Sequence, residues 1–121
     1  NLNPYRKVLV EFNQTKCFYC GKHLHDDNDK VSPVDHFIPW SFVKDDKLWN
    51  FVLACHRCNS SKSNILPEQD YFAALKERNA KLCNMNSSIV KQDFKTYSYS
   101  KLIEMHHSAI FNGFEYGWKA N

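Results

Sequence analysis

Apolar residues recur three or four positions apart in two parts of the chain, which is the spacing of amphipathic helices. Near the N-terminus this spacing covers residues 8–12 and follows Asn3 and Pro4, a pair typical of a helix start. The second half of the chain predicts three further helices, over about 68–81, 89–94 and 98–112. Ser87 or Ser88 is in the right place to cap the second of them.

The middle of the chain has short apolar runs instead, and these predict two strands, over residues 31–36 and 51–55. We expect a loop over 41–47 between the strands and a polar turn over 26–29 before the first of them. A helix is expected to begin near Cys58-Asn59. The order strand, loop, strand and helix, followed by a helical C-terminal half, predicts the α+β fold class.

Composition indicates one ordinary folded domain. The chain has 121 residues, of which 43% are hydrophobic and 24% are charged, with a net charge of +3. This balance excludes a disordered tail, and no apolar run reaches the roughly 18 residues of a membrane span. Because the sequence begins with Asn1, we expect a fragment of a longer chain. Within it, 1–16 would carry an N-terminal helix, 17–64 the core and 65–121 a helical extension.

Four of the five cysteines form two C-x-x-C pairs, Cys17 with Cys20 and Cys55 with Cys58. Two such turns can supply the four thiolates of a structural Zn²⁺ site. A disulfide framework suits a secreted chain with an even cysteine count, whereas Cys83 is left over here and no signal peptide is visible. A redox C-x-x-C is a second alternative, but two distant pairs favour metal. Neighbouring histidines are alternative ligands, namely His23, His25 and His56.

Two segments, VDHFIPWS at 34–41 and LWNFVLACHRCNSSK at 48–62, resemble the HNH endonuclease family. The segment CFYCG at 17–21 is similar to the first zinc knuckle of its four-cysteine members. The resemblance implies the ββα-metal finger, in which two antiparallel strands and a helix hold one divalent cation. The family's third motif residue is usually His, but Asn59 stands there, so the chain resembles an H-N-N variant, as in some RNA-guided effectors.

The resemblance implies hydrolysis of DNA phosphodiester bonds, with RNA left open as a substrate. His36 is the expected general base, because an imidazole can accept a proton from water at neutral pH. By resemblance, Asp35 and Asn59 bind the catalytic cation, and Asn50 holds the loop and orients His36. Two oxygen ligands suit Mg²⁺ or Mn²⁺. Since neighbours on a strand point to opposite faces, we expect a bulge or a strand end at Asp35 and His36.

Polar residues at the start of the last motif helix are candidate nucleic-acid contacts, because helix N-termini and basic side chains favour phosphate. They are Arg57, Ser60, Ser61 and Lys62. The leading interpretation is a metal-dependent nuclease of restriction or phage defence, placed in the cytoplasm because zinc needs reduced thiols. The alternatives are a zinc-stabilised nucleic-acid-binding module without catalysis and a zinc-supported protein-interaction domain. In the nuclease, the helical half 65–121 is a candidate surface for a further domain or a protein partner.

Overall fold

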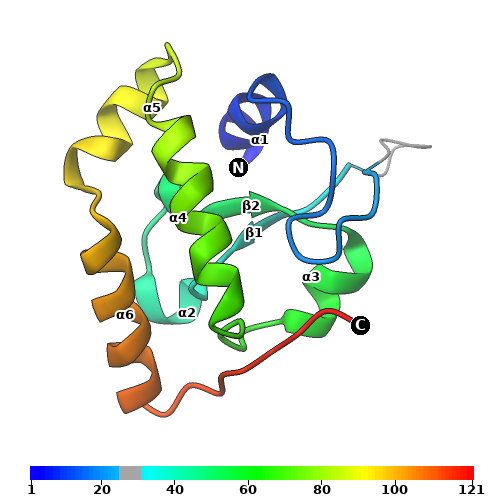
Figure 1. The fold of residues 1–121 in the computed structure, drawn as a ribbon, viewed down its shortest axis with the longest axis vertical. Helices are drawn as coiled ribbons and strands as arrows, with labels where there is room; N and C mark the ends of the chain where they lie inside the picture. Colours follow the sequence, from blue (N-terminus) through cyan, green and yellow to red (C-terminus); the bar gives the residue numbers. More distant parts are fainter. Residues whose placement is uncertain (25–30) are drawn as a thin grey trace.

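The computed structural model of the chain describes residues 1–24 and 31–121 (Figure 1). The elements are α1 (Asn3–Glu11), β1 (Val34–His36), α2 (Trp40–Val43), the 3-10 helix η1 (Leu48–Asn50), β2 (Phe51–Leu53), α3 (His56–Lys62), α4 (Asp70–Leu82), α5 (Ser88–Asp93), the 3-10 helix η2 (Phe94–Thr96) and α6 (Tyr99–Phe111). This order confirms the α+β class, with a two-stranded hairpin followed by a helix and then a helical C-terminal half. The turn predicted over 26–29 lies outside the described residues.

The strands β1 and β2 pair antiparallel, with Val34 opposite Leu53 and His36 opposite Phe51. Both strands are shorter than predicted. One further bond continues the ladder, from the Ala54 N–H to the Pro33 carbonyl at 3.1 Å, but Pro33 has no N–H to donate in return. The proline therefore ends regular pairing at this side of the hairpin, and residues 31–33 are not part of the strand.

Side chains of β2 alternate between two hydrophobic clusters, as the period of a strand requires. Phe51 and Leu53 pack in a cluster with residues of α1, α4 and α5. Val52 points the other way, into a larger cluster that also contains Tyr19 and residues of α4 and α6. In Figure 1, α1 lies at one side of the hairpin and α3 follows the end of β2. The hairpin is thus buried on both faces.

The helices begin where capping side chains satisfy free backbone N–H groups. Ser87 accepts from the Val90 N–H at 3.4 Å and so caps α5, which confirms one of the two predicted serines. The predicted N-terminal helix and the three predicted C-terminal helices all form, with ends shifted by one or two residues. The helix α3 begins at His56, earlier than expected, because the Cys55 sulfur accepts from the Cys58 N–H at 3.4 Å and acts as its cap.

One prediction of local structure is wrong. Residues 41–47, expected as a loop, contain most of the short helix α2, Trp40–Val43. The Pro39 carbonyl accepts from the Phe42 N–H at 3.0 Å and from the Val43 N–H at 3.2 Å, which closes one helical turn. Lys44 ends it in the left-handed region, with φ 50°.

The C-terminal segment runs beside α3 (Figure 1). Leu66 donates its N–H to the Glu115 carbonyl at 2.9 Å, and Trp118 donates its N–H to the Leu66 carbonyl at 3.1 Å. The buried Trp118 indole also donates to Ser61 Oγ at 3.0 Å. Among the described residues, no helix has the length and hydrophobicity that crossing a membrane requires.

Candidate active site and metal centre

The structure brings the four predicted cysteine ligands together. Their sulfur atoms lie within 4.8 Å of one another, in a group made of Cys17, Cys20, Cys55 and Cys58. The Cys20 and Cys55 sulfurs are 3.8 Å apart, which equals the edge of about 3.8 Å of a tetrahedron with Zn–S bonds of about 2.3 Å. The donor set and its spacing fit one tetrahedral metal ion. His23 and His56 are not part of this group, and His25 lies outside the described residues.

A backbone hydrogen bond shapes the first cysteine turn. Gly21 donates its N–H to the Cys17 carbonyl at 3.0 Å and has a φ of 76°, which glycine adopts without strain.

The surroundings of the thiols change their pKa values. Burial raises the pKa of the Cys17 and Cys58 thiols. Burial opposes ionisation of Cys55 too, but hydrogen bonds from Cys58 and the other thiols outweigh it and lower the pKa of Cys55. Cys83 is exposed at the end of α4, apart from this group.

Asp35 lies in the middle of β1 and is buried. Its Oδ2 accepts from the Tyr19 hydroxyl at 2.5 Å and lies 3.2 Å from the Lys62 ammonium. Burial raises the pKa of this carboxyl, and the nearby Lys62 and Tyr19 oppose that rise. Because Tyr19 stands between the two cysteines of the first turn, the cysteine group and the Asp35 site are held to each other.

Lys62 is fully buried, with no exposed surface. Besides the ion pair with Asp35, its ammonium donates to the His36 carbonyl at 2.9 Å. Burial lowers the pKa of Lys62, and Asp35 opposes this change. The two contacts hold the ammonium inside the protein, which argues against its predicted role as a phosphate contact. The sequence could have indicated that Lys62 is buried, because residues four apart share a helix face and Cys58 on the same helix faces inward.

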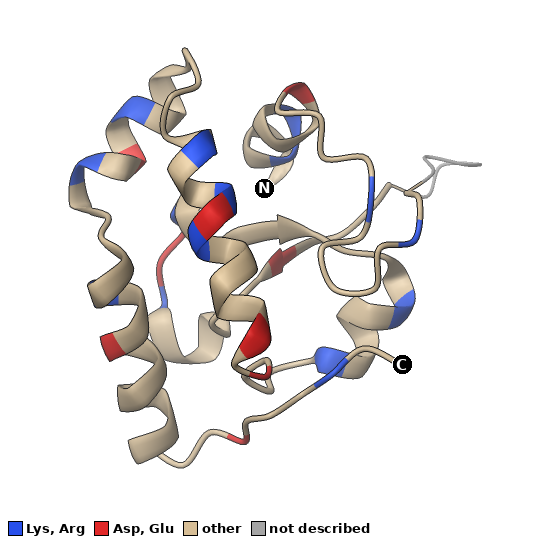
Figure 2. Cartoon of the chain, in the orientation of Figure 1, with Lys and Arg blue, Asp and Glu red and all other residues tan. Residues whose placement is uncertain are grey.

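The other predicted phosphate contacts, Arg57, Ser60 and Ser61, are exposed on α3. This helix carries basic residues and no acidic one, while the two signs of charge are interspersed over the rest of the fold (Figure 2). Asn59 is half-buried and lies three residues before Lys62. Residues three apart share a helix face, so Asn59 lies on the side of α3 that reaches β1 through the Lys62–Asp35 pair.

Replacing Lys62 with methionine is expected to lower the free energy of unfolding by about 3–5 kcal/mol, because the Asp35 charge would be buried without a partner. Chemical denaturation of the purified protein measures this. The matched control is Arg57→Met on the exposed side of the same helix, expected to change stability by less than about 0.5 kcal/mol. Adding Asp35→Asn to the Lys62 variant should recover part of the loss, and equal losses in the single and double variants would contradict the pairing.

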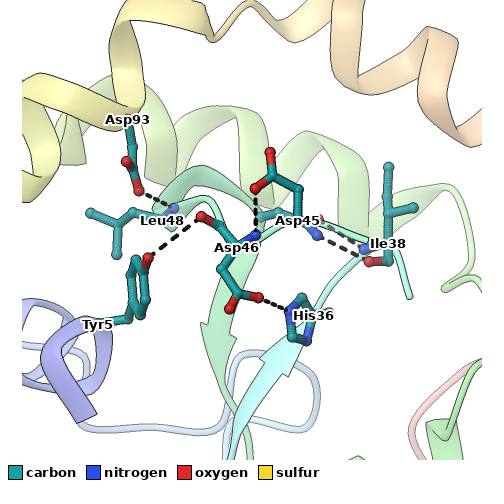
Figure 3. Close-up of polar contacts among 8 residues, drawn as sticks. Tyr5, His36, Ile38, Asp45, Asp46, Leu48 and Asp93 are labelled. Carbon is teal, nitrogen blue, oxygen red and sulfur yellow. Dashed lines mark hydrogen bonds and ion pairs between the residues drawn. The ribbon is translucent and has the colours of Figure 1, made fainter. Parts of the chain in front are cut away.

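His36 ends β1 and points to the face opposite to Asp35. The register is regular, with Asp35 opposite Val52 and His36 opposite Phe51, so the expected strand end is present and there is no bulge. The imidazole packs edge-on against the Phe51 ring, with centroids 4.6 Å apart. Its Nε2 lies 2.8 Å from Asp46 Oδ1 (Figure 3).

Asn50 is buried and fixes the chain just after His36. Its Oδ1 accepts from the Ile38 N–H at 2.9 Å, and its Nδ2 donates to the Ile38 carbonyl at 3.0 Å. The side chain thus contacts the backbone after the histidine, and the imidazole itself contacts Asp46. Asp46 was not among the predicted site residues. The sequence does contain two adjacent carboxylates, Asp45 and Asp46, in the segment that joins the two strands. Spacing alone does not show that this segment folds back onto His36.

Comparison with known proteins identifies this arrangement. Residues 17–68 match the model of the family described as HNH endonuclease, a segment that contains the four cysteines, both strands and α3. This segment belongs to the HNH endonuclease family.

Over 77 residues, the chain is also 34% identical to the CRISPR-associated endonuclease Cas9 of Streptococcus mutans serotype c (strain ATCC 700610 / UA159). This match covers 64% of the chain and 6% of that protein, so the chain spans a small part of the length of the relative. The HNH segment is joined to the rest of the fold at its end, where Leu66 and Glu68 bond to the backbone of Glu115 and Trp118.

Proposed function

We propose that the chain is a metal-dependent endonuclease that hydrolyses DNA phosphodiester bonds, with His36 as its general base. The observation that carries this proposal is the end of β1 in an HNH segment. There a partly exposed imidazole, fixed by Asp46 at 2.8 Å, directly follows a buried carboxylate. A binding module without catalysis has no need for a partly exposed imidazole that the Asp46 carboxylate holds in place, so the site favours the enzyme.

In the proposed reaction, water attacks the phosphorus atom and His36 accepts the proton that water loses. The bond from phosphorus to the leaving oxygen breaks, and that oxygen takes a proton from solvent. Asn50 keeps the backbone after His36 in place through its two bonds to Ile38. Exposed Arg57, Ser60 and Ser61 are proposed to contact the nucleic-acid backbone.

The catalytic cation is proposed to be Mg²⁺ or Mn²⁺, held by Asp35 and Asn59. Tyr19 and Lys62 both contact Oδ2 of Asp35, which leaves Oδ1 as the carboxylate oxygen for a cation. That oxygen and the Asn59 amide oxygen are hard donors that suit these ions. When bound, the ion would supply stabilisation of the charge that develops on the phosphate.

The four cysteines are proposed to bind a structural Zn²⁺, since four thiolates leave no open coordination position for catalysis. Thiols that bind zinc must stay reduced, which supports the cytoplasm as the proposed compartment. We also propose that 1–16, 17–64 and 65–121 act as one nuclease domain, and that its helical half, 65–121, docks a further domain or a protein partner. The biological setting is proposed to be restriction or phage defence.

The decisive experiment is cleavage of supercoiled plasmid by protein freed of loosely bound metal, with and without added Mg²⁺ or Mn²⁺. Nicking is expected only when one of these ions is added, while the zinc content stays at about one ion per chain. Omission of Mg²⁺ is preferable to a chelator, because a chelator would also remove the structural ion. Single-stranded DNA and RNA of the same sequence compare the substrates.

A result without nicking, from folded and zinc-loaded protein, would contradict the proposal. Salt-dependent DNA binding by that protein would then indicate the binding module. Binding of a protein partner that does not change when nucleic acid is added would indicate the protein-interaction domain.

A further inference from the structure

We propose that Asp46 is a positioning residue for His36: its carboxylate accepts the Nε2–H of the imidazole and leaves Nδ1 as the nitrogen that takes the proton from water. This inference rests on the proposed function and assigns a role that the HNH motif residues do not include. Imidazole has one protonated and one free nitrogen when neutral, and the hydrogen bond at one nitrogen decides which is free.

The contact itself is short and direct. Nε2 of His36 lies 2.8 Å from Oδ1 of Asp46, a normal hydrogen-bond length. A carboxylate can only accept at this distance, so the nitrogen that faces it must carry the hydrogen. Within the described part of the chain, Asp46 is the hydrogen-bond partner of this imidazole. The side chain of Asn50 bonds instead to Ile38.

The segment that carries Asp46 is anchored on both sides of the contact (Figure 3). The Asp46 carbonyl accepts from the Tyr5 hydroxyl of α1 at 3.5 Å, and the Asp46 N–H donates to Asp45 Oδ1 at 2.9 Å. Two residues later, the Leu48 N–H donates to the buried carboxylate of Asp93, on α5, at 2.8 Å. Elements distant in sequence therefore hold this carboxylate in front of the histidine.

The imidazole plane is fixed as well. The Phe51 ring is fully buried and meets the imidazole edge-on, and it is in turn packed by Tyr5, with centroids 4.8 Å apart. The side chain of His36 keeps 17% of its surface exposed and that of Asp46 keeps 41%. The His36 ring is thus held by the Asp46 hydrogen bond at one nitrogen and by Phe51 at its side, while part of the ring stays open to solvent. A general base that accepts a proton from water requires this arrangement.

The test compares Asp46→Ala, Asp46→Asn and Asp46→Glu with the control Asp45→Asn. The control removes the same charge one residue away, and its amide oxygen can still accept from the Asp46 N–H. We expect Asp46→Ala to lower the single-turnover rate of plasmid nicking at saturating DNA by about 10–100-fold, a part of what a general base contributes. DNA affinity, melting temperature and zinc content should stay at wild-type values. Asp46→Glu should recover part of the rate, Asp46→Asn less, and Asp45→Asn should stay within twofold of wild type.

A readout independent of cleavage is the ¹⁵N NMR spectrum of the His36 ring in its neutral form. We expect the Nε2–H tautomer in the wild type and a mixture of tautomers in Asp46→Ala. If the wild type cleaves DNA and Asp46→Ala cleaves equally fast, or if the wild-type ring carries Nδ1–H, the role of Asp46 is overturned while the proposed function stands. If the zinc-loaded wild type cleaves no DNA, the proposed function fails and the positioning role fails with it, whatever the tautomer.

Discussion

Replacing His36 with alanine is expected to lower the rate of DNA nicking by at least about a hundredfold, because the general base of the proposed reaction is lost. The fold should survive. The imidazole ends a strand and is partly exposed, and the contacts it gives up are one hydrogen bond to Asp46 and one ring edge on Phe51. The measurement is the initial rate of supercoiled-plasmid nicking with Mg²⁺, at DNA concentrations that saturate both proteins.

The matched control is His107→Ala, which removes an exposed histidine of α6 on a different part of the fold. It should nick at the wild-type rate. His36→Ala should keep its zinc, its melting temperature close to that of the wild type and its affinity for DNA, so that the loss appears in turnover alone. Nicking at the wild-type rate by His36→Ala, or loss of zinc from this variant, would contradict its role as the base.

The parts of the site that follow from local chemistry could be predicted from the sequence. The two C-x-x-C turns place their sulfurs through short-range geometry, so pairing Cys17 and Cys20 with Cys55 and Cys58 needed only the chain to fold back once. The serine cap of α5 follows from side-chain chemistry at one helix end, and it too was predicted correctly.

The remaining parts depend on contacts between distant segments, which spacing does not reveal. In the sequence, Lys62 has the pattern of an exposed lysine on a polar helix. In the structure, α3 packs this side chain against β1, where its ammonium lies next to Asp35. Asp46 lies ten residues after His36, and its segment also contacts Tyr5 of α1 and, through Leu48, Asp93 of α5, so its position depends on elements distant in the sequence. The first strand was predicted too long for a local reason. Pro33 has no N–H to pair, and the apolar pattern did not take this into account.

Replacing Cys58 with serine is expected to remove the bound zinc and unfold the domain at temperatures where the wild type is folded. Structural zinc contributes about 10–16 kcal/mol in small zinc-binding peptides, which is comparable to the whole stability of about 5–15 kcal/mol of a typical domain. Cys58 is buried at the start of α3, and the group it belongs to ties the first cysteine turn to the end of β2. Tyr19 of that turn donates to Asp35, so loss of the metal should also release the carboxylate proposed to bind the catalytic cation.

The effect should be specific to the four ligands. Cys83→Ser changes an exposed thiol outside the group and should leave zinc content and melting temperature unchanged. Metal analysis of the purified proteins gives the zinc content, and thermal unfolding followed by circular dichroism gives the melting temperature. If Cys58→Ser melts like the wild type, the cysteines do not support the fold through a metal ion. If the wild type carries no zinc and keeps its melting temperature in a chelator, the four sulfurs lie together for another reason, and Asp35 is held by Tyr19 and Lys62 alone.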